Sequence, residues 1–293
     1  MKNIILLYGL ILLLFSCNES VDYPSLQNNI EKIIKSEKGK FAIAFKNLED
    51  GQVILINEME EFHAASTMKT PVMIEAFKKS FENKISLDDT ILVKNEFISI
   101  VDGSLFKLSS FDDSDKKTYE RIGGHLSLRE LIYEMITISS NFATNLVIDY
   151  IGHEDINKTM RDLGAKDINV LRGVEDIKAY NKGLNNTTTA LDLLKIYENL
   201  ALGRVINNKL SQEMVDILKD QKYDDIIPKY LPKEIEIAHK DGWVSGTRHD
   251  SGIVFINDEK KYVLVLLSKN LEDEIKGADI LAKVSLEIYN SLI

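Results

Sequence analysis

Strand-like segments lie near the two ends of the chain, and a long series of helical segments separates them. Residues 41–45 and 53–56 have the pattern of strands, and the turn-forming residues 47–51 between them predict a hairpin. Near the other end the strand pattern returns three times, at residues 234–240, 252–257 and 262–267. The two sets most simply join one antiparallel sheet, which requires a fold that brings both ends of the chain together.

Apolar residues recur at helical spacing through the rest of the chain. Pro71 falls in the first turn of one such segment, where its missing N–H is tolerated. We therefore predict an α+β fold, in which residues 25–293 form one antiparallel sheet flanked by helices and an all-helical lobe at about residues 82–205, with a cleft between the lobes. The expected helices cover residues 26–36, 65–81, 127–136, 142–151, 156–163, 190–202, 212–218 and 275–289.

The N-terminal 16 residues have the pattern of a secretory signal, because a basic residue precedes an apolar run too short to span a bilayer comfortably. Leu14 and Ser16 before the only cysteine, Cys17, resemble the lipobox of a bacterial lipoprotein. That resemblance implies cleavage after residue 16, lipid attachment at Cys17 and a tether over residues 17–24. We expect a periplasmic domain held at a bacterial membrane only through lipid. An ordinary signal peptide with an incidental cysteine is the alternative.

The composition is that of an ordinary globular protein, with 44% hydrophobic and 28% charged residues. The formal net charge is −10 and the basic residues are spread out, so we expect no nucleic-acid partner. A single cysteine excludes an internal disulfide framework, and no cluster of residues has the spacing of a zinc site. We therefore expect no metal and no other cofactor, and a monomer is the default expectation for the assembly.

The most informative short motif is Ser66-Thr67-Met68-Lys69. A serine hydroxyl is a poor nucleophile at neutral pH and needs a nearby base, and residues three positions apart share one face of a helix. Lys69 can accept the proton of Ser66 only while it is neutral, which burial and a second cation would promote. Alone, the motif occurs by chance about once in a chain of this length. Without further motifs, Ser66 is better explained as the N-cap of a helix.

Three further motifs follow in a characteristic order: Ser139-Ser140-Asn141, then Glu175 ahead of the threonines at 187–189, then Lys240-Asp241-Gly242. Together with the Ser66 motif, they resemble the class A β-lactamases and related penicillin-recognising serine enzymes, whose Ser-x-x-Lys, Ser-Asp-Asn and Lys-Thr-Gly motifs have this order. The resemblance runs from about residue 26 to the C-terminus and is densest at residues 62–69, 139–145 and 239–248. It implies a serine β-lactamase that hydrolyses the β-lactam amide through an acyl-enzyme.

The resemblance also implies a role for each residue of the acylation chemistry. Ser66 is the nucleophile and Lys69 its base. Ser139 passes a proton to the leaving nitrogen, and the backbone N–H groups of Ser66 and Trp243 form the oxyanion hole, which acts on charge that develops during the reaction. In isolation, the Ser139 motif is equally well explained as the cap of the helix that follows. Ser140 replaces an Asp that is mainly structural in the family, so we expect this replacement to affect the stability of the fold more than the catalytic reaction.

Substrate binding is implied for four residues. Asn141 contacts the side-chain amide of the substrate. Lys240 and Arg248, with Gly242 beside them, bind its carboxylate, which an arginine can hold through two hydrogen bonds. For a single lysine or arginine, an exposed charge at a sheet edge is the default explanation. Asp241 departs from the family's Thr or Ser, and an ionised Asp repels a substrate carboxylate unless one of the two cations neutralises it or it turns away.

The second departure concerns the loop between residues 169 and 187. Glu175 is the candidate base for hydrolysis of the acyl-enzyme, although Asp176 is an alternative and both could be surface acids. The family's Arg-x-Glu spacing is one residue longer here, and its water-holding Asn is replaced by Ala179. The Asp that pairs with the loop's arginine is Asn186, so we expect a looser loop. Fast acylation and slow or moderate turnover should follow.

Other functions remain open at this stage. A D,D-peptidase or esterase of the same fold would act on cell-wall peptides or small esters. A penicillin-binding sensor would acylate once, but no second domain for a signal is evident. A Ser-His-Asp hydrolase is excluded, because the chain has no Gly-x-Ser-x-Gly motif. The expected partner is therefore a small β-lactam or a cell-wall peptide.

Overall fold

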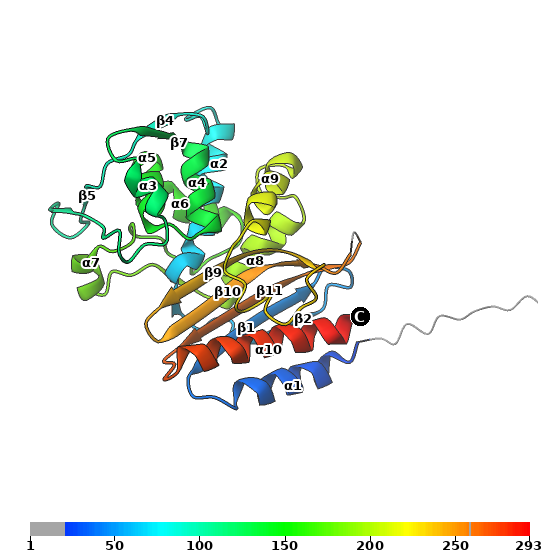
Figure 1. Cartoon of the computed structure of the whole chain (residues 1–293). Helices are drawn as coiled ribbons and strands as arrows, with labels where there is room; N and C mark the ends of the chain where they lie inside the picture. The colour runs from blue at the N-terminus through cyan, green and yellow to red at the C-terminus, as the bar shows by residue number, and fades with distance from the viewer. Residues whose placement is uncertain (1–20, 258) are drawn as a thin grey trace, which may run out of the picture.

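The computed structural model describes residues 21–257 and 259–293 (Figure 1). The predicted signal at residues 1–16 and the predicted lipid site at Cys17 lie outside these residues. Among the helices of the described part, none is both long and apolar enough to cross a membrane.

A five-stranded antiparallel sheet forms the centre of the fold (Figure 1). In pairing order its strands are β2 (Val53–Ile56), β1 (Lys40–Asn47), β11 (Lys261–Lys269), β10 (Thr247–Phe255) and β9 (Glu236–Val244). β1 pairs with β11 along its whole length, from Lys40 opposite Lys269 to Asn47 opposite Tyr262. This ladder joins the N-terminal hairpin to the C-terminal strands, which confirms the prediction of one sheet built from both ends of the chain.

Helices cover both faces of the sheet, which explains why β1 is apolar on both sides. α1 (Tyr23–Ile34) and α10 (Glu274–Leu292) lie together on one face (Figure 1). Phe41 and Ile43 of β1 belong to the core beneath α1 and α10, whereas Ala42 between them belongs to the core of the opposite face. Successive side chains alternate across a strand, so a strand covered on both sides is apolar at nearly every position.

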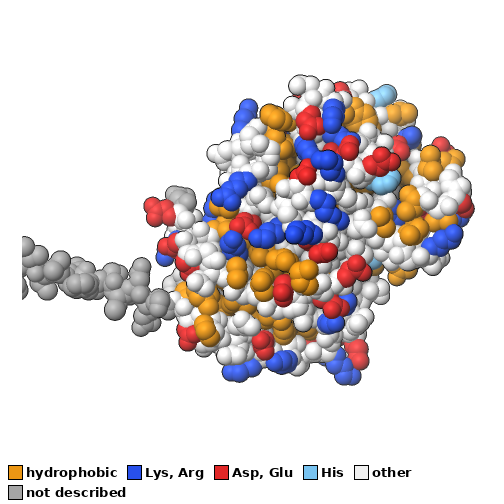
Figure 2. Space-filling view, turned by 180° about the vertical axis from the view of Figure 1, so that it is seen from behind, with side chains coloured by type: hydrophobic (Ala, Val, Ile, Leu, Met, Phe, Trp, Pro, Cys, Tyr) orange, Lys and Arg blue, Asp and Glu red, His pale blue; other side chains and the backbone are white. Residues whose placement is uncertain are grey.

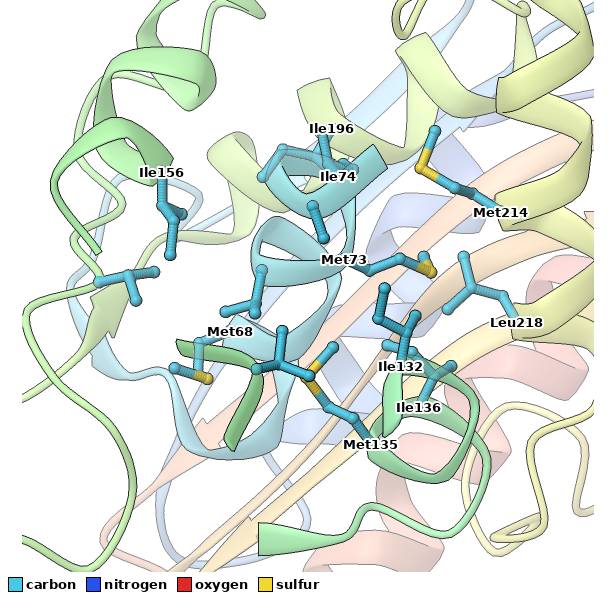
Figure 3. Close-up of a cluster of buried hydrophobic side chains, with 14 of the residues drawn as sticks. Met68, Met73, Ile74, Ile132, Met135, Ile136, Ile156, Ile196, Met214 and Leu218 are labelled. Atoms are coloured by element: carbon cyan, nitrogen blue, oxygen red, sulfur yellow. The ribbon is translucent and has the colours of Figure 1, made fainter. Parts of the chain in front are cut away.

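The helical lobe occupies the other face and is built around α2 (Lys69–Phe81). Residues 69–77 of α2 are all buried, and Figure 3 shows Met73 among apolar side chains of the surrounding helices. Because a buried helix in a close-packed core has little room to move, the N-terminal end of α2 is held firmly. The surrounding helices are α4 (Leu128–Thr137), α5 (Asn141–Ile151), α6 (Glu154–Asp162), α8 (Ala190–Ala201) and α9 (Asn208–Lys219).

α1 and α9 begin three or more residues earlier than predicted, because polar caps start them. α1 begins at Tyr23, inside the segment expected as a tether, where the Asp22 side chain accepts a hydrogen bond from Ser25 N at 3.1 Å. α9 begins four residues before the predicted residue 212, where Asn207 caps it through Leu210 N. In both cases apolar periodicity marks the packed part of the helix and misses its first turn.

Short elements were not predicted, because two to five residues carry too little periodicity to be recognised. One of the ladders pairs the residues just before Ser66 with the end of the loop that carries Glu175. These short elements are α3 (Lys116–Glu120), α7 (Ile177–Asn181), and the ladders β3 (Phe62–His63) with β8 (Thr187–Thr188), β4 (Thr90–Leu92) with β7 (His125–Ser127), and β5 (Phe97–Ile98) with β6 (Leu105–Phe106). The helix predicted over residues 65–81 is divided into a 3₁₀ turn, η1 (Ala65–Met68), and α2.

Charges of both signs are interspersed on the face shown in Figure 2. Among the ion pairs of the described residues, Glu60 contacts both Lys40 and Lys269, at 2.8 and 2.5 Å.

Candidate active site

Ser66 lies in η1, a single turn of 3₁₀-helix that leads directly into α2. The preceding Ala65 has φ of 46°, a left-handed conformation that is costly for a residue with a Cβ. Ser66 is half-buried and lines two cavities of about 300 and 280 Å³. We call these the Arg248 cavity and the Glu175 cavity, after one residue in the wall of each. The Ser66 side chain therefore borders space that a small molecule can enter.

Gly242 allows β9 to lie close against η1. A Cβ at this position would be 3.2 Å from Thr67 Cγ2 and 3.3 Å from the Cβ atoms of Ala65 and His249. These separations are tighter than ordinary packing, so any larger residue would push β9 away from Ser66. Gly242 thus positions the strand that carries the Lys240 motif.

Lys69 is completely buried, and its amine contacts the Ser139 turn. Nζ donates hydrogen bonds to Ser139 O at 2.7 Å, to Ser139 Oγ at 3.2 Å and to Asn141 Oδ1 at 3.0 Å. Burial lowers the pKa of Lys69 to about 7, and the nearby positive charge of Lys240 acts in the same direction. At neutral pH a large fraction of Lys69 is therefore uncharged and able to accept a proton.

The turn before α5 holds Ser139 in place. Ser139 itself has φ of 56°, and the side chain of Ser140 caps α5 by accepting from Ala143 N at 3.0 Å. The next free backbone N–H, that of Phe142, donates to Asp113 Oδ2 at 2.7 Å. A carboxylate is thus present at this helix end, but it comes from a distant loop rather than from the motif. Ser140 and Asp113 together satisfy the buried N-terminus of α5.

The structure separates the roles of the two adjacent acids in the loop. Glu175 Oε1 accepts a hydrogen bond from Asn141 Nδ2 at 3.0 Å, so the Asn141 amide joins Glu175 to Lys69. Burial raises the pKa of Glu175, although the bond from Asn141 opposes this. Asp176 instead caps α7 and accepts from Ser99 Oγ at 2.9 Å and Ile100 N at 3.0 Å. Its carboxylate is occupied by structural bonds.

The loop around Glu175 is fastened by amides instead of the family's ion pair. Arg172 Nε donates to Leu184 O at 2.8 Å, while Asn186 accepts from Arg172 N at 3.1 Å and donates to Arg172 O at 3.0 Å. Asn145 exchanges two hydrogen bonds with the backbone of Val174, at 2.7 and 2.9 Å. These hydrogen bonds take the place of the ion pair that Asn186 cannot form. A looser loop therefore does not follow from the presence of Asn186 alone.

Both cations expected to bind a substrate carboxylate already contact a carboxylate of the chain. The Lys240 amine contacts Asp241 Oδ1, and Arg248 Nη2 contacts Asp225. Burial by itself would raise the pKa of Asp241, but the charge and hydrogen bond of Lys240, together with the charges of His239 and Lys69, lower it. Asp241 is therefore ionised and neutralised by Lys240. Asp225 lies between α9 and β9, outside every motif.

Trp243 lines both cavities together with Ser66 and stands opposite Arg248 in the β9–β10 ladder. Its ring is 65% exposed, and its indole N–H donates to Glu274. The exposed ring is thus available to pack against a bound molecule.

A sequence model described as "Beta-lactamase enzyme family" matches residues 25–292. The chain belongs to this family. The β-lactamase BRO-1 of Moraxella catarrhalis is 23% identical to it over 277 residues, covering 90% of this chain and 84% of the relative. The β-lactamase CTX-M-97 of Escherichia coli is 26% identical over 263 residues, covering 88% and 86%.

Solved structures share the fold of this β-lactamase-family chain. The TLA-1 extended-spectrum β-lactamase aligns with a TM-score of 0.81 at 20% identity, over 92% of this chain and 98% of the other. The structure titled PBP-A aligns with a TM-score of 0.77 at 23% identity, over 91% and 95%. These likenesses confirm the predicted α+β fold of a sheet flanked by helices with a helical lobe.

Most of the predicted residues of this family member meet around Ser66. Two important partners, Asp113 and Asp225, were missed, because each lies in a loop with no recognisable pattern and acts through a contact distant in sequence. The predicted residues that line a cavity or contact a residue that does are Ser66, Lys69, Ser139, Asn141, Glu175, Lys240, Trp243 and Arg248.

Proposed function

We propose that this β-lactamase-family enzyme hydrolyses the amide of a β-lactam ring in two steps, through an acyl-enzyme on Ser66. The observation that carries the assignment is the buried Lys69 amine, 3.2 Å from Ser139 Oγ and 3.0 Å from Asn141 Oδ1, next to the cavity that Ser66 lines. The lowered pKa of Lys69 supports its role as a base. The names of the relatives support a β-lactam as the substrate.

In the acylation step, neutral Lys69 accepts the proton of Ser66 and the serine oxygen attacks the ring carbonyl. The C–N bond then breaks. The departing nitrogen takes the proton of the Ser139 hydroxyl, which Lys69 replaces, so Lys69 ends the step neutral. The backbone N–H groups of Ser66 and Trp243 stabilise the negative charge that forms on the carbonyl oxygen.

In the deacylation step, Glu175 accepts a proton from a water molecule as its oxygen attacks the ester on Ser66. The C–O bond breaks, the proton returns to the serine oxygen, and the acid product leaves. The hydrogen bond from Asn141 orients Glu175, and its raised pKa brings the carboxylate closer to the strength that a base needs at neutral pH.

Intact-mass analysis after rapid mixing with benzylpenicillin tests both steps. We expect an adduct with the mass of the whole penicillin in the wild type and none in Ser66→Ala. In Glu175→Gln the adduct should persist, because loss of a general base slows deacylation by about 10²–10⁴-fold. Absence of any adduct on Ser66 overturns the function. If the adduct lifetime in Glu175→Gln is unchanged, Glu175 is not the base for deacylation. If the wild type turns over a D-Ala-D-Ala peptide faster than β-lactams, the enzyme is a peptidase.

We further propose that residues 1–16 direct export, that Cys17 carries lipid, and that the enzyme acts as a monomer in the periplasm. The basic start, the apolar run and the Leu14-Phe15-Ser16-Cys17 pattern support the export and lipid assignments. Cys17→Ala should release the protein from the membrane fraction, and a variant that stays bound contradicts lipid attachment. Light scattering of the released protein should give the mass of one chain.

A further inference from the structure

Lys240 and Arg248 are each paired with a carboxylate of the chain, but the two ion pairs differ in their exposure to solvent. Lys240 is fully buried and the Asp241 side chain is only 13% exposed, so this pair is locked inside the protein. Arg248 is 16% exposed and Asp225 is 50% exposed. An ion pair with such an exposed partner is weak and can be displaced.

The wall of the Arg248 cavity is acidic as a whole. Among the described residues that line it are three aspartates, Asp112, Asp225 and Asp241, and a single basic side chain, that of Arg248. Lys240 lies behind Asp241 and neutralises it, Arg248 neutralises Asp225, and the exposed Asp112 adds a negative charge at the surface. The groups nearest Ser66 therefore form two neutral pairs, and the remaining charge repels anions.

A substrate carboxylate entering this cavity has to displace Asp225 from Arg248 and lie beside Asp241. Like charges placed side by side in an interface are strongly unfavourable, whereas an uncharged group meets two neutral pairs and avoids this cost. The two aspartates thus oppose the binding of a substrate carboxylate. Lys240 and Arg248 would attract that carboxylate if they were not paired with Asp241 and Asp225.

Building on the hydrolysis proposed above, we propose that Asp225 and Asp241 determine specificity by occupying the place of a substrate carboxylate. The preferred substrates then carry an uncharged group at that position, such as an ester or an amide. Asp241 excludes the anion continuously, and Asp225 competes with it for Arg248.

Benzylpenicillin and its methyl ester form a matched pair of probes for this specificity, since they differ only at the position in question, where a methyl group removes the negative charge. The wild type should process the ester at least as efficiently as the acid, measured as kcat/KM. The acid-to-ester ratio of kcat/KM should rise about tenfold in Asp241→Thr and about threefold in Asp225→Asn, mainly through a lower KM for the acid. The neighbouring Asp224→Asn removes the same charge without touching Arg248 and should leave the ratio unchanged.

Because both probes are measured on the same preparation, the ratio does not depend on how much of a variant is folded. A wild type that prefers the free acid more than tenfold overturns the assignment, and so does an unchanged ratio in both variants. Failure of the hydrolytic function itself is distinct, because it leaves no adduct on Ser66 with either probe.

Discussion

Two buried lysines in this site have different chemistry because their partners differ. Lys69 donates to a carbonyl, a hydroxyl and an amide oxygen, all of them neutral. Lys240 instead contacts the carboxylate of Asp241. Without a carboxylate in contact, Lys69 bears the cost of burial, and its pKa falls to about 7. Lys69 can therefore act as a base, whereas the Lys240 amine is held in an ion pair.

The acylation rate should consequently rise with pH. The pKa of Lys69 lies near 7, so the neutral, proton-accepting form grows through pH 7 and the rate should level off above about pH 8. Rapid-quench measurement of adduct formation from pH 5.5 to 9 gives the profile. The permanently charged Lys69→Arg should acylate about 10²–10⁴-fold more slowly. A wild-type rate that stays flat over this range would falsify the role of Lys69.

At the scale of elements, the N-terminus of α5 depends on two polar residues distant in sequence. Ser140 is fully buried and caps the helix locally, whereas Asp113 reaches Phe142 N from a loop 29 residues earlier in the chain. Because the turn at Ser139 is attached to this helix end, the cap also positions the groups that contact Lys69.

Asp113→Ala should lower the free energy of unfolding by about 1–3 kcal/mol, because it leaves the buried N–H of Phe142 without a partner. Urea denaturation followed by circular dichroism measures the change. The adjacent Asp112→Ala removes an exposed carboxylate and should change stability by less than about 0.5 kcal/mol. Equal stability of the two variants would show that Asp113 is not needed to cap α5.

At the scale of the whole molecule, the sheet also fixes the loop that carries Asp225. Asp250 in β10 contacts His239 Nδ1 in β9 at 2.9 Å and accepts from Ile227 N at 3.0 Å. Burial alone would lower the pKa of His239, but the charge and hydrogen bond of Asp250, together with the contact to Asp224 and the charge of Asp241, raise it to about 9. His239 is therefore a cation buried against an anion, and the loop is bonded to that anion.

This pair makes the stability depend on pH. The folded-state pKa of His239 exceeds its unfolded value near 6.5, so its stabilisation is complete below about pH 6.5 and is lost as pH rises through about 9. The loss should be about 1–3 kcal/mol between pH 6 and 9.5. Urea denaturation of the wild type beside His239→Gln isolates this contribution, with the exposed His125→Gln as control. The same pH dependence in all three proteins would rule out His239 as its source.

Much of the fold could be predicted, because the spacing of apolar residues along the sequence indicates which side chains are buried. Apolar residues at helical spacing located the long helices, and the apolar β1 segment marked a strand that proves to be covered on both faces. The short elements could not be predicted, since segments such as α7 depend on a cap and on contacts made after folding. Helix starts at Tyr23 and Asn208 were missed for a related reason, because first turns are held by polar caps rather than by apolar packing.

The sequence alone predicted Ser66 as the nucleophile and Lys69 as its base, because their separation of three residues is a local property of the chain. It also identified the order of the motifs that accompany them. Only the tertiary structure decided which acid bonds to Asn141, since Glu175 and Asp176 are neighbours whose carboxylates accept from different partners. It alone paired Arg248 with Asp225, because such a contact depends on which loops come together in space and leaves no spacing in the sequence to detect.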